Sequence, residues 1–243
     1  MNKTFALVTG GTRGIGLAIA KRLAGEGATL GLLYARDHEA ATAAVAEIAS
    51  VGGQAKVLAC DLNDLAAIPQ AAAQLEKECG GKFSLLVNNA GFIDDRFLLF
   101  SDDAHLEQIL NVNLKAAISL CRYCSKAMIA KKQGVMVNVI SPAAQRGRPG
   151  QTAYAAAKGG LLSFTKTLAA ELGPLGIRVN ALSPGIIDTD LVASLPENVR
   201  NDLINRVPMR RMGHVHEVAA ACMLLIRATY MSGTVLAVDG GLT

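Results

Sequence analysis

The chain lacks several features that would assign it to common functional classes. Its 243 residues include no tryptophan, and no apolar run reaches the ~18–20 residues that are needed to cross a membrane. Lysine and arginine form no cluster, and a net charge of +4 is too small to indicate a nucleic-acid-binding protein. The sequence therefore argues against a membrane-spanning protein and against a nucleic-acid partner.

Cysteine is scarce, and its number is odd. The chain has five cysteines, and its first apolar stretch, residues 4–9, leaves no room for a signal peptide. We therefore expect reduced thiols and a cytoplasmic protein. Cys121 and Cys124 form a Cys-x-x-Cys pair inside a helical stretch without a second ligand pair, so we expect two core thiols. His214 and His216 also lack further ligands, and no metal site is predicted.

The composition and the order of apolar segments predict the fold. Charged residues make up 18% of the chain and hydrophobic residues 51%, which is typical of a compact folded protein. The length fits one large α/β domain, which we expect to span residues 1–243. Strands are predicted at residues 4–9, 28–34, 54–60, 83–87, 134–141, 177–182 and 234–238. Right-handed connections between them give a single doubly wound Rossmann-type domain, with a parallel sheet of about seven strands and helices on both faces.

The intervening segments are predicted to be mostly helical. Helices are expected at residues 17–27, 38–51, 64–79, 102–132, 152–173 and 215–228. One long loop is predicted from residue 184 to about residue 213; it is far longer than ordinary connections, and we expect it to be a substrate lid. Gly159 and Gly160 fall in the middle of a helix, where each costs roughly 1 kcal/mol relative to alanine. We expect another backbone to pack closely there, with a second subunit as one source.

A glycine-rich turn separates the first strand from the first helix. The residues Gly10-Gly11-Thr12-Arg13-Gly14-Ile15-Gly16 follow the strand directly. Such a turn allows a dinucleotide pyrophosphate to meet the helix N-terminus, where free N–H groups favour anions. The spacing Gly-x-x-x-Gly-x-Gly differs from the commoner Gly-x-Gly-x-x-Gly, so the turn alone is weak evidence. The cofactor contacts expected here are Gly10, Thr12, Arg13, Gly14, Ile15 and Gly16.

The end of the second strand indicates which dinucleotide binds. NAD-binding sites usually place an acidic residue there for the ribose 2′-hydroxyl, whereas this strand ends in Tyr34-Ala35-Arg36. Arg13 and Arg36 suit a 2′-phosphate by charge and by the fork geometry of the guanidinium. The pattern favours NADPH, and the alternative is that both arginines are ordinary surface residues.

Polar and small residues follow the third and fourth strands. Asp61 and Leu62 come after the third strand, where adenine is expected to lie, and Asn89, Ala90 and Gly91 come after the fourth. Open α/β sheets bind their ligands at the carboxyl ends of the strands. We therefore predict cofactor contacts at all five positions.

The stretch from Ser141 to Lys158 carries the candidate chemistry. Tyr154 and Lys158 are four residues apart and share one face if the segment is helical, while Ser141 ends the fifth strand. An ammonium beside a phenol favours the phenolate, so we expect a lowered pKa for Tyr154. A phenol tuned in this way exchanges a proton when a carbonyl and an alcohol interconvert. The alternative is a solvated ion–dipole pair on a surface helix.

Together these motifs resemble the short-chain dehydrogenase/reductase family. The likeness rests on Thr9–Gly16, Asn88–Gly91, Ser141 and Tyr154-Ala155-Ala156-Ala157-Lys158, and it covers essentially the whole chain. The resemblance implies that Asn113 completes a catalytic tetrad by holding a water that links Lys158 to solvent. It also implies assembly into homotetramers through the long fourth and fifth helices. The residues that it places beside the nicotinamide are Pro184, Gly185, Ile187 and Thr189.

Within that family the chain is most similar to 3-oxoacyl-[acyl-carrier-protein] reductases, through residues 150–190 and 207–213. The resemblance implies reduction of a 3-oxoacyl thioester by NADPH, with an acyl-carrier protein or another thioester carrier as partner. Lys131 and Lys132 match one carrier-binding position of those reductases, whereas Leu175 replaces the usual second one and Pro142 follows Ser141. Fatty-acid, polyketide and polyene-type chain building all fit.

Two other functions remain open at this stage. One is a dehydrogenase of the same fold that acts on a sugar, a polyol or another secondary alcohol, because fold alone does not select a substrate. The other is a non-catalytic subunit that only binds cofactor.

Overall fold

A computed structural model describes residues 4–193 and 196–243 of the chain. One sheet of seven parallel strands runs in the order β3-β2-β1-β4-β5-β6-β9. This is a doubly wound Rossmann-type sheet, so the predicted fold class is confirmed. Residues 1–3 and 194–195, which the predicted domain includes, lie outside the described ranges. The strands are β1 (Phe5–Thr9), β2 (Thr29–Tyr34), β3 (Gln54–Ala59), β4 (Leu85–Asn88), β5 (Gly134–Val139), β6 (Ile177–Pro184) and β9 (Val235–Val238).

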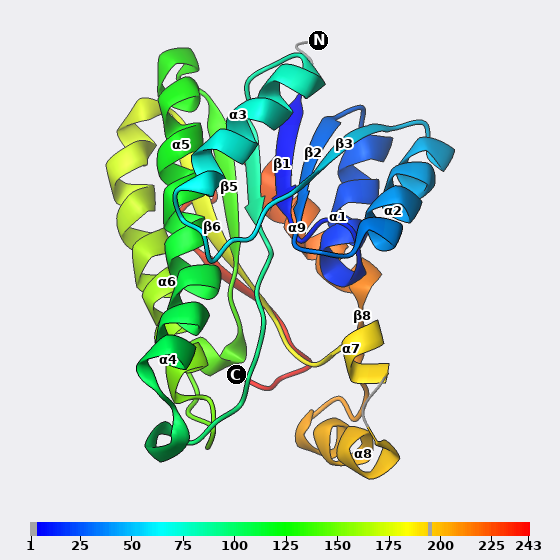
Figure 1. The fold of residues 1–243 in the computed structure, drawn as a ribbon, viewed down its shortest axis with the longest axis vertical. Helices are drawn as coiled ribbons and strands as arrows, with labels where there is room; N and C mark the ends of the chain where they lie inside the picture. The colour runs from blue at the N-terminus through cyan, green and yellow to red at the C-terminus, as the bar shows by residue number, and fades with distance from the viewer. Residues whose placement is uncertain (1–3, 194–195) are drawn as a thin grey trace.

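Helices cover both faces of this sheet (Figure 1). On one face pack α1 (Gly14–Gly25), α2 (His38–Ser50) and α9 (Val215–Arg227). On the other pack α3 (Ala67–Cys79), α5 (Ala116–Lys131) and α6 (Thr152–Leu172). In Figure 1 the green α5 and α6 lie to the left of the strands, and the blue α1 and α2 lie to the right.

Alternation along the strands explains the two faces. Val8 of β1 faces the α1 and α9 side, while its neighbour Leu7 faces the α3 and α5 side. Successive side chains of a strand point to opposite faces, and a parallel sheet covered on both sides is apolar on both. All five cysteines are buried. The interpretation of Cys121 and Cys124 as core thiols is therefore confirmed.

The predicted helix over residues 102–132 is divided into three parts. An α-helix, α4 (Asp103–Leu110), leads into a π-helical turn at Asn111–Lys115, and α5 follows. Such π-turns are rare and frequently occur at functional sites. The two asparagines that are unfavourable inside an α-helix, Asn111 and Asn113, both lie in this turn.

The segment after β6 is more structured than the sequence indicated. The prediction of one long loop over residues 184–213 is wrong, because the segment contains β7 (Ile187–Asp188), α7 (Asp190–Ala193) and α8 (Glu197–Arg206). A short parallel pairing joins β7 to β8 (Gly213–His214). Residues 194–195 of the predicted lid lie outside the described ranges. Across those ranges, no helix combines the length and apolarity needed to span a bilayer.

Candidate active site

The carboxyl ends of the central strands bring the predicted site residues together. β1, β4, β5 and β6 are neighbours in the sheet, and each ends at the same edge because all four are parallel. The glycine turn follows β1, Asn89 follows β4, Ser141 lies two residues beyond β5, and Pro184 ends β6. The edge is where ligands of open α/β sheets bind.

The glycine turn has a tight backbone without bulky side chains, so a pyrophosphate can approach it closely. A Cβ atom at Gly16 would lie 2.1 Å from the carbonyl oxygen of Gly10, so no side chain fits there. Gly14 has a φ of +53°, in the left-handed region that glycine tolerates best. Arg13 is the N-cap of α1, and the free N–H groups of the first helical turn therefore face this bend. These features fit a dinucleotide, with Thr12 buried and Ile15 half-buried beside the turn.

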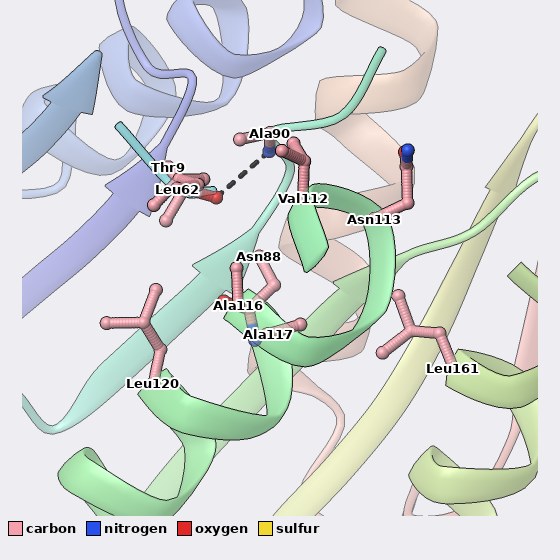
Figure 2. Close-up of a pocket in the computed structure, with 10 residues that line it drawn as sticks. All are labelled: Thr9, Leu62, Asn88, Ala90, Val112, Asn113, Ala116, Ala117, Leu120 and Leu161. Atoms are coloured by element: carbon pink, nitrogen blue, oxygen red, sulfur yellow. Dashed lines mark hydrogen bonds between the residues drawn. The ribbon is translucent and has the colours of Figure 1, made fainter. Parts of the chain in front are cut away.

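Hydrogen bonds fix the turn to the end of β4. The Thr9 hydroxyl accepts from the backbone N–H groups of Asn89, at 3.0 Å, and Ala90, at 2.9 Å. The Asn89 amide donates to the carbonyl oxygens of Thr9 and Gly10. Figure 2 shows the bond between Thr9 and Ala90. Thr9 was not predicted as a site residue, and its position as the last residue of β1 was the available signal.

The residues near the end of β2 are consistent with the predicted binding of NADPH. Arg13 and Arg36 are exposed, and neither guanidinium forms a hydrogen bond or ion pair within residues 4–193 and 196–243. The nearest acid, Asp37, is the N-cap of α2 and accepts from Ala40 N–H at 2.9 Å. Its carboxylate therefore already has a structural role. Binding of a 2′-phosphate by the two arginines stays a prediction.

The two residues predicted beside adenine occupy different environments. Asp61 is exposed at the end of β3, and its carboxylate accepts from the backbone N–H of Asn63. Leu62 is buried and lines a small cavity of ≈ 10 Å³ (Figure 2). Of the two, only the Asp61 side chain is open to a ligand.

Lys158 is a buried ammonium behind the tyrosine. Tyr154 and Lys158 lie one turn apart on α6, with the lysine Nζ 5.8 Å from the centroid of the tyrosine ring. The same Nζ donates to the carbonyl oxygen of Val139, at 2.9 Å. Burial lowers the pKa of Lys158 to about 8. The two side chains share a face as predicted, but they are not a solvated surface pair.

The expected lowering of the Tyr154 pKa is wrong for this structure. Burial raises the pKa of the phenol above its ordinary value, and the nearby carboxylate of Asp95 raises it further. A hydrogen bond with Ser141 acts in the opposite direction. The Ser141 hydroxyl also accepts from the backbone N–H of Ala143, at 3.2 Å, and so caps the short 3-10 helix at Pro142–Ala144.

Asn113 approaches Lys158 through the π-turn. Its amide nitrogen donates to the carbonyl oxygens of Phe92, at 3.0 Å, and Ile109, at 3.1 Å. Its Oδ1 is buried and has no partner among the described residues. A Cβ at Gly91 would lie 2.6 Å from this Oδ1 and 3.3 Å from the Lys158 Nζ, so the three residues meet closely. The unpaired oxygen fits the water-holding role predicted for Asn113, which stays a prediction.

The segment predicted to hold the nicotinamide lies against the glycine turn. A Cβ at Gly14 would be 3.5 Å from Thr189 Cγ2, so the two segments are in contact. Gly185 N–H donates to Val238 O, which joins the end of β6 to β9. Ile187 and Pro184 are buried. The structure therefore brings all four predicted residues to the same edge.

Two further predictions concern contacts with a second subunit and with a carrier, and both stay predictions. Gly160 faces the same chain, since a Cβ there would lie 3.0 Å from Leu114 Cδ2. Lys131 and Lys132 lie at the far end of α5, where Lys132 O approaches Gly176 just before β6. A helix rises about 1.5 Å per residue, which puts them roughly 27–28 Å from Asn113 within one subunit.

The residues that suggested a metal have another role. His214 is the N-cap of α9, and its backbone N–H donates to the Glu217 carboxylate at 2.8 Å. The interpretation as helix-start residues is thus confirmed for His214. Within the described part of the chain, no group of histidine, cysteine and acidic residues could hold a metal ion.

Comparison with known proteins gives relatives over the whole length. A family model described as enoyl-(acyl carrier protein) reductase matches residues 10–243. The 3-oxoacyl-[acyl-carrier-protein] reductase FabG of Chlamydia trachomatis is 37% identical, over 100% of this chain and 98% of the relative. The short-chain reductase protein NovJ of Streptomyces niveus is 38% identical, over 98% of this chain and 94% of the relative.

Solved structures share the fold closely. A blue fluorescent protein from a metagenomic library, solved in complex with NADPH, superposes with a TM-score of 0.92. It is 35% identical, and the match covers 100% of this chain and 98% of that chain.

Proposed function

The chain belongs to the short-chain dehydrogenase/reductase family, and from that premise we propose that it is an NADPH-dependent ketoreductase acting on a 3-oxoacyl thioester. The product is the 3-hydroxyacyl thioester. The single observation that carries the proposal is the convergence of Ser141, Tyr154, Lys158 and Asn113 on the sheet edge that holds the glycine turn.

The side chains have separate roles in this reaction. Ser141 and Tyr154 bind the ketone oxygen by hydrogen bonds and hold the carbonyl carbon in place for reduction. The bound nicotinamide supplies the hydride. Tyr154 donates its proton to the ketone oxygen as that oxygen gains negative charge. Lys158 binds the nicotinamide ribose, and Asn113 connects the lysine to solvent through a water on its unpaired Oδ1.

The proposal of NADPH rests on charge at the end of β2. Arg13 and Arg36 are unpaired cations in the described ranges, and Asp37 caps α2 instead of facing a ribose. The blue fluorescent protein of similar fold was solved in complex with NADPH, which supports the same cofactor for this chain. Cofactor contacts are assigned to the glycine turn, to Asn89–Gly91, and to Pro184, Gly185, Ile187 and Thr189.

An acyl-carrier protein or another thioester carrier is the proposed source of the substrate, because several relatives carry that carrier in their names. Lys131 and Lys132 do not lie beside Asn113 in one subunit, so their use by a carrier requires a second copy. We therefore propose a homo-oligomer, with a tetramer as the expected form.

A turnover assay separates this function from its rivals. Purified protein should oxidise NADPH in the presence of a short 3-oxoacyl thioester, and Tyr154→Phe is the matched inactive control. Turnover of a sugar or polyol alone would indicate a different substrate class. Cofactor binding without turnover of any of these compounds would indicate a non-catalytic subunit.

A further inference from the structure

A segment after β4, residues 91–97, is held over the candidate site by several hydrogen bonds. The Asn113 amide donates to Phe92 O, and the buried His105 ring contacts Asp94 O at 3.2 Å. Further along, Arg96 N–H donates to Gly150 O at 2.7 Å. The segment is thus attached both to the π-turn and to the loop that precedes α6.

Within this segment, Asp95 is fixed by a buried amide. Gln151 is 7% exposed, and its Nε2 donates to both carboxylate oxygens of Asp95, at 3.1 and 3.2 Å. Gln151 is the N-cap of α6, and its carbonyl oxygen accepts from Ala155 N–H at 2.7 Å. The residue that holds the carboxylate is therefore three positions before Tyr154 on the same helix start.

We propose that Asp95, held in place by Gln151, adds to the burial that keeps the Tyr154 phenol protonated, and thereby favours ketone reduction at this site. The inference rests on the proposed function, in which Tyr154 is the proton donor. A fixed negative charge near a phenol disfavours the phenolate, because two like charges repel. Reduction requires the phenol, whereas oxidation of the alcohol requires the phenolate. Asp95 is a positioning residue that acts through Tyr154 and does not itself exchange a proton.

Other groups face the same phenol. Ser141, beyond the end of β5, hydrogen-bonds the phenol and opposes the effect of Asp95. Lys158, one turn along α6, places its Nζ 5.8 Å from the ring centroid and donates to Val139 O. Asp94, the neighbour of Asp95, instead pairs with Arg96 at 2.8 Å and with His105 at 3.5 Å. Asp94 is therefore a matched control of equal charge.

The decisive experiment titrates Tyr154 directly. Tyrosinate formation is followed by ultraviolet difference absorption, and the same protein carrying Tyr154→Phe is subtracted to remove the other three tyrosines. Asp95→Asn keeps the shape and a hydrogen-bond acceptor for Gln151 but removes the charge. We expect the midpoint of Tyr154 ionisation to fall to lower pH in Asp95→Asn, because the repelling charge is gone. Asp94→Asn should leave it unchanged.

The pH profile of turnover provides a second measurement. In Asp95→Asn, the alkaline limb of kcat/KM for reduction should move to lower pH, and so should the acid limb for oxidation of the 3-hydroxyacyl thioester. Gln151→Leu should shift the titration in the same direction, since the carboxylate is no longer held; it also replaces Asp95→Asn if that variant does not fold.

The outcomes separate this inference from the proposed function. A Tyr154 midpoint that is unchanged in Asp95→Asn, or that moves equally in Asp94→Asn, would overturn it. Loss of activity that is uniform across pH would also overturn it, since a merely structural tie predicts that result. A wild-type protein that reduces no ketone would contradict the proposed function, whereas the direct titration would still test Asp95.

Discussion

At the scale of single residues, the candidate site depends on ionisable groups that burial has changed. Lys158 is buried as an ammonium with a hydrogen bond to one backbone carbonyl, and its pKa is lowered to about 8. Tyr154 has its pKa raised by burial and by Asp95. Both shifts favour the neutral form, as expected where water is excluded. The site therefore holds a protonated phenol over most of the pH range in which proteins are studied.

Removal of the phenol oxygen tests the proton donor. Tyr154→Phe keeps the ring, so the barrier to reduction should rise by about 3–5 kcal/mol through loss of general-acid catalysis and of orientation. The NADPH dissociation constant should hardly change, because the phenol contacts the substrate. Lys158→Ala, in contrast, should weaken both turnover and cofactor binding. A Tyr154→Phe enzyme with most of its kcat intact would contradict the assignment.

The buried ammonium should reduce the stability of the fold. A lysine whose pKa is lower in the folded state than in the unfolded state destabilises the fold below its folded pKa, and stability rises as pH increases from about 8 toward 10.5. Lys158→Met should therefore increase the free energy of unfolding by about 1–2 kcal/mol at pH 7, after allowance for the lost bond to Val139.

Denaturant unfolding at pH 7 and pH 10 measures this effect. The advantage of Lys158→Met should shrink at the higher pH, where the wild-type lysine is neutral in the folded state. A Lys158→Met protein that is less stable than the wild type at pH 7 would show that the hydrogen bond outweighs the cost of burial.

Cofactor choice is also a matter of single residues. Because Arg13 and Arg36 are exposed and unpaired in the described ranges, NADPH should be preferred over NADH by at least ~1–2 kcal/mol, roughly tenfold or more in kcat/KM. Arg36→Asp should shift the preference toward NADH. Arg22→Asp, on the exposed side of α1, is the control and should leave the ratio unaltered. Equal rates of the wild type with the two cofactors would refute the proposal.

At the scale of elements, the π-turn at Asn111–Lys115 places one asparagine beside the lysine of another helix. The turn interrupts what would otherwise be one long helix, and it directs Asn113 toward the segment after β4. Gly91 is the point of closest approach, since a methyl group there would collide with Asn113 Oδ1. Element geometry, and not side-chain choice alone, therefore sets the distance between Asn113 and Lys158.

A single methyl group should disturb this arrangement. In Gly91→Ala the new Cβ would lie 2.6 Å from Asn113 Oδ1, so the asparagine must move, and we expect kcat to fall by about 10²-fold. Gly147→Ala, in the loop before α6, meets no atom within 4 Å and should retain full activity. Steady-state kinetics of the two variants, with melting temperatures as a folding control, compare these outcomes. Normal kcat in Gly91→Ala would show that the contact has no role in turnover.

At the scale of the whole molecule, the single chain leaves apolar surface uncovered. Leu99 and Phe100, just before α4, are 87% and 71% exposed, and Leu162 and Phe164 of α6 are half-buried. Exposed large apolar side chains such as these are candidates for an interaction site. Together with the family resemblance, this supports pairing of subunits through the outer surface of α5 and α6.

A substitution on that surface tests the proposed assembly. The residue chosen must not take part in packing within the single subunit. Gly160 is unsuitable because it packs on Leu114, whereas Ser163 is exposed on α6. The wild type should be oligomeric in light scattering at micromolar concentration, and Ser163→Arg should dissociate or weaken it, because a buried unpaired charge is costly. Ser50→Arg, at the end of α2, is the control. A monomeric wild type would refute the proposed assembly.

The sequence by itself determined the order of strands and helices and the edge at which the site lies. Apolar runs with short glycine or polar ends, alternating with helices, define parallel strands, and the carboxyl ends of such strands meet at one edge because all of them run in the same direction. It also put Tyr154 and Lys158 on one face, since helical periodicity is a local property. These features depend on residues that are close in the chain.

Only the tertiary structure decided the features that depend on burial and on distant contacts. The raised pKa of Tyr154, the lowered pKa of Lys158 and the attachment of Asp95 to Gln151 arise from groups as far apart as residues 95 and 154. The position of Lys131, distant from Asn113, follows from the direction of α5. Local pattern contains no information on solvent exclusion, and desolvation, not spacing, sets the charge states at this site.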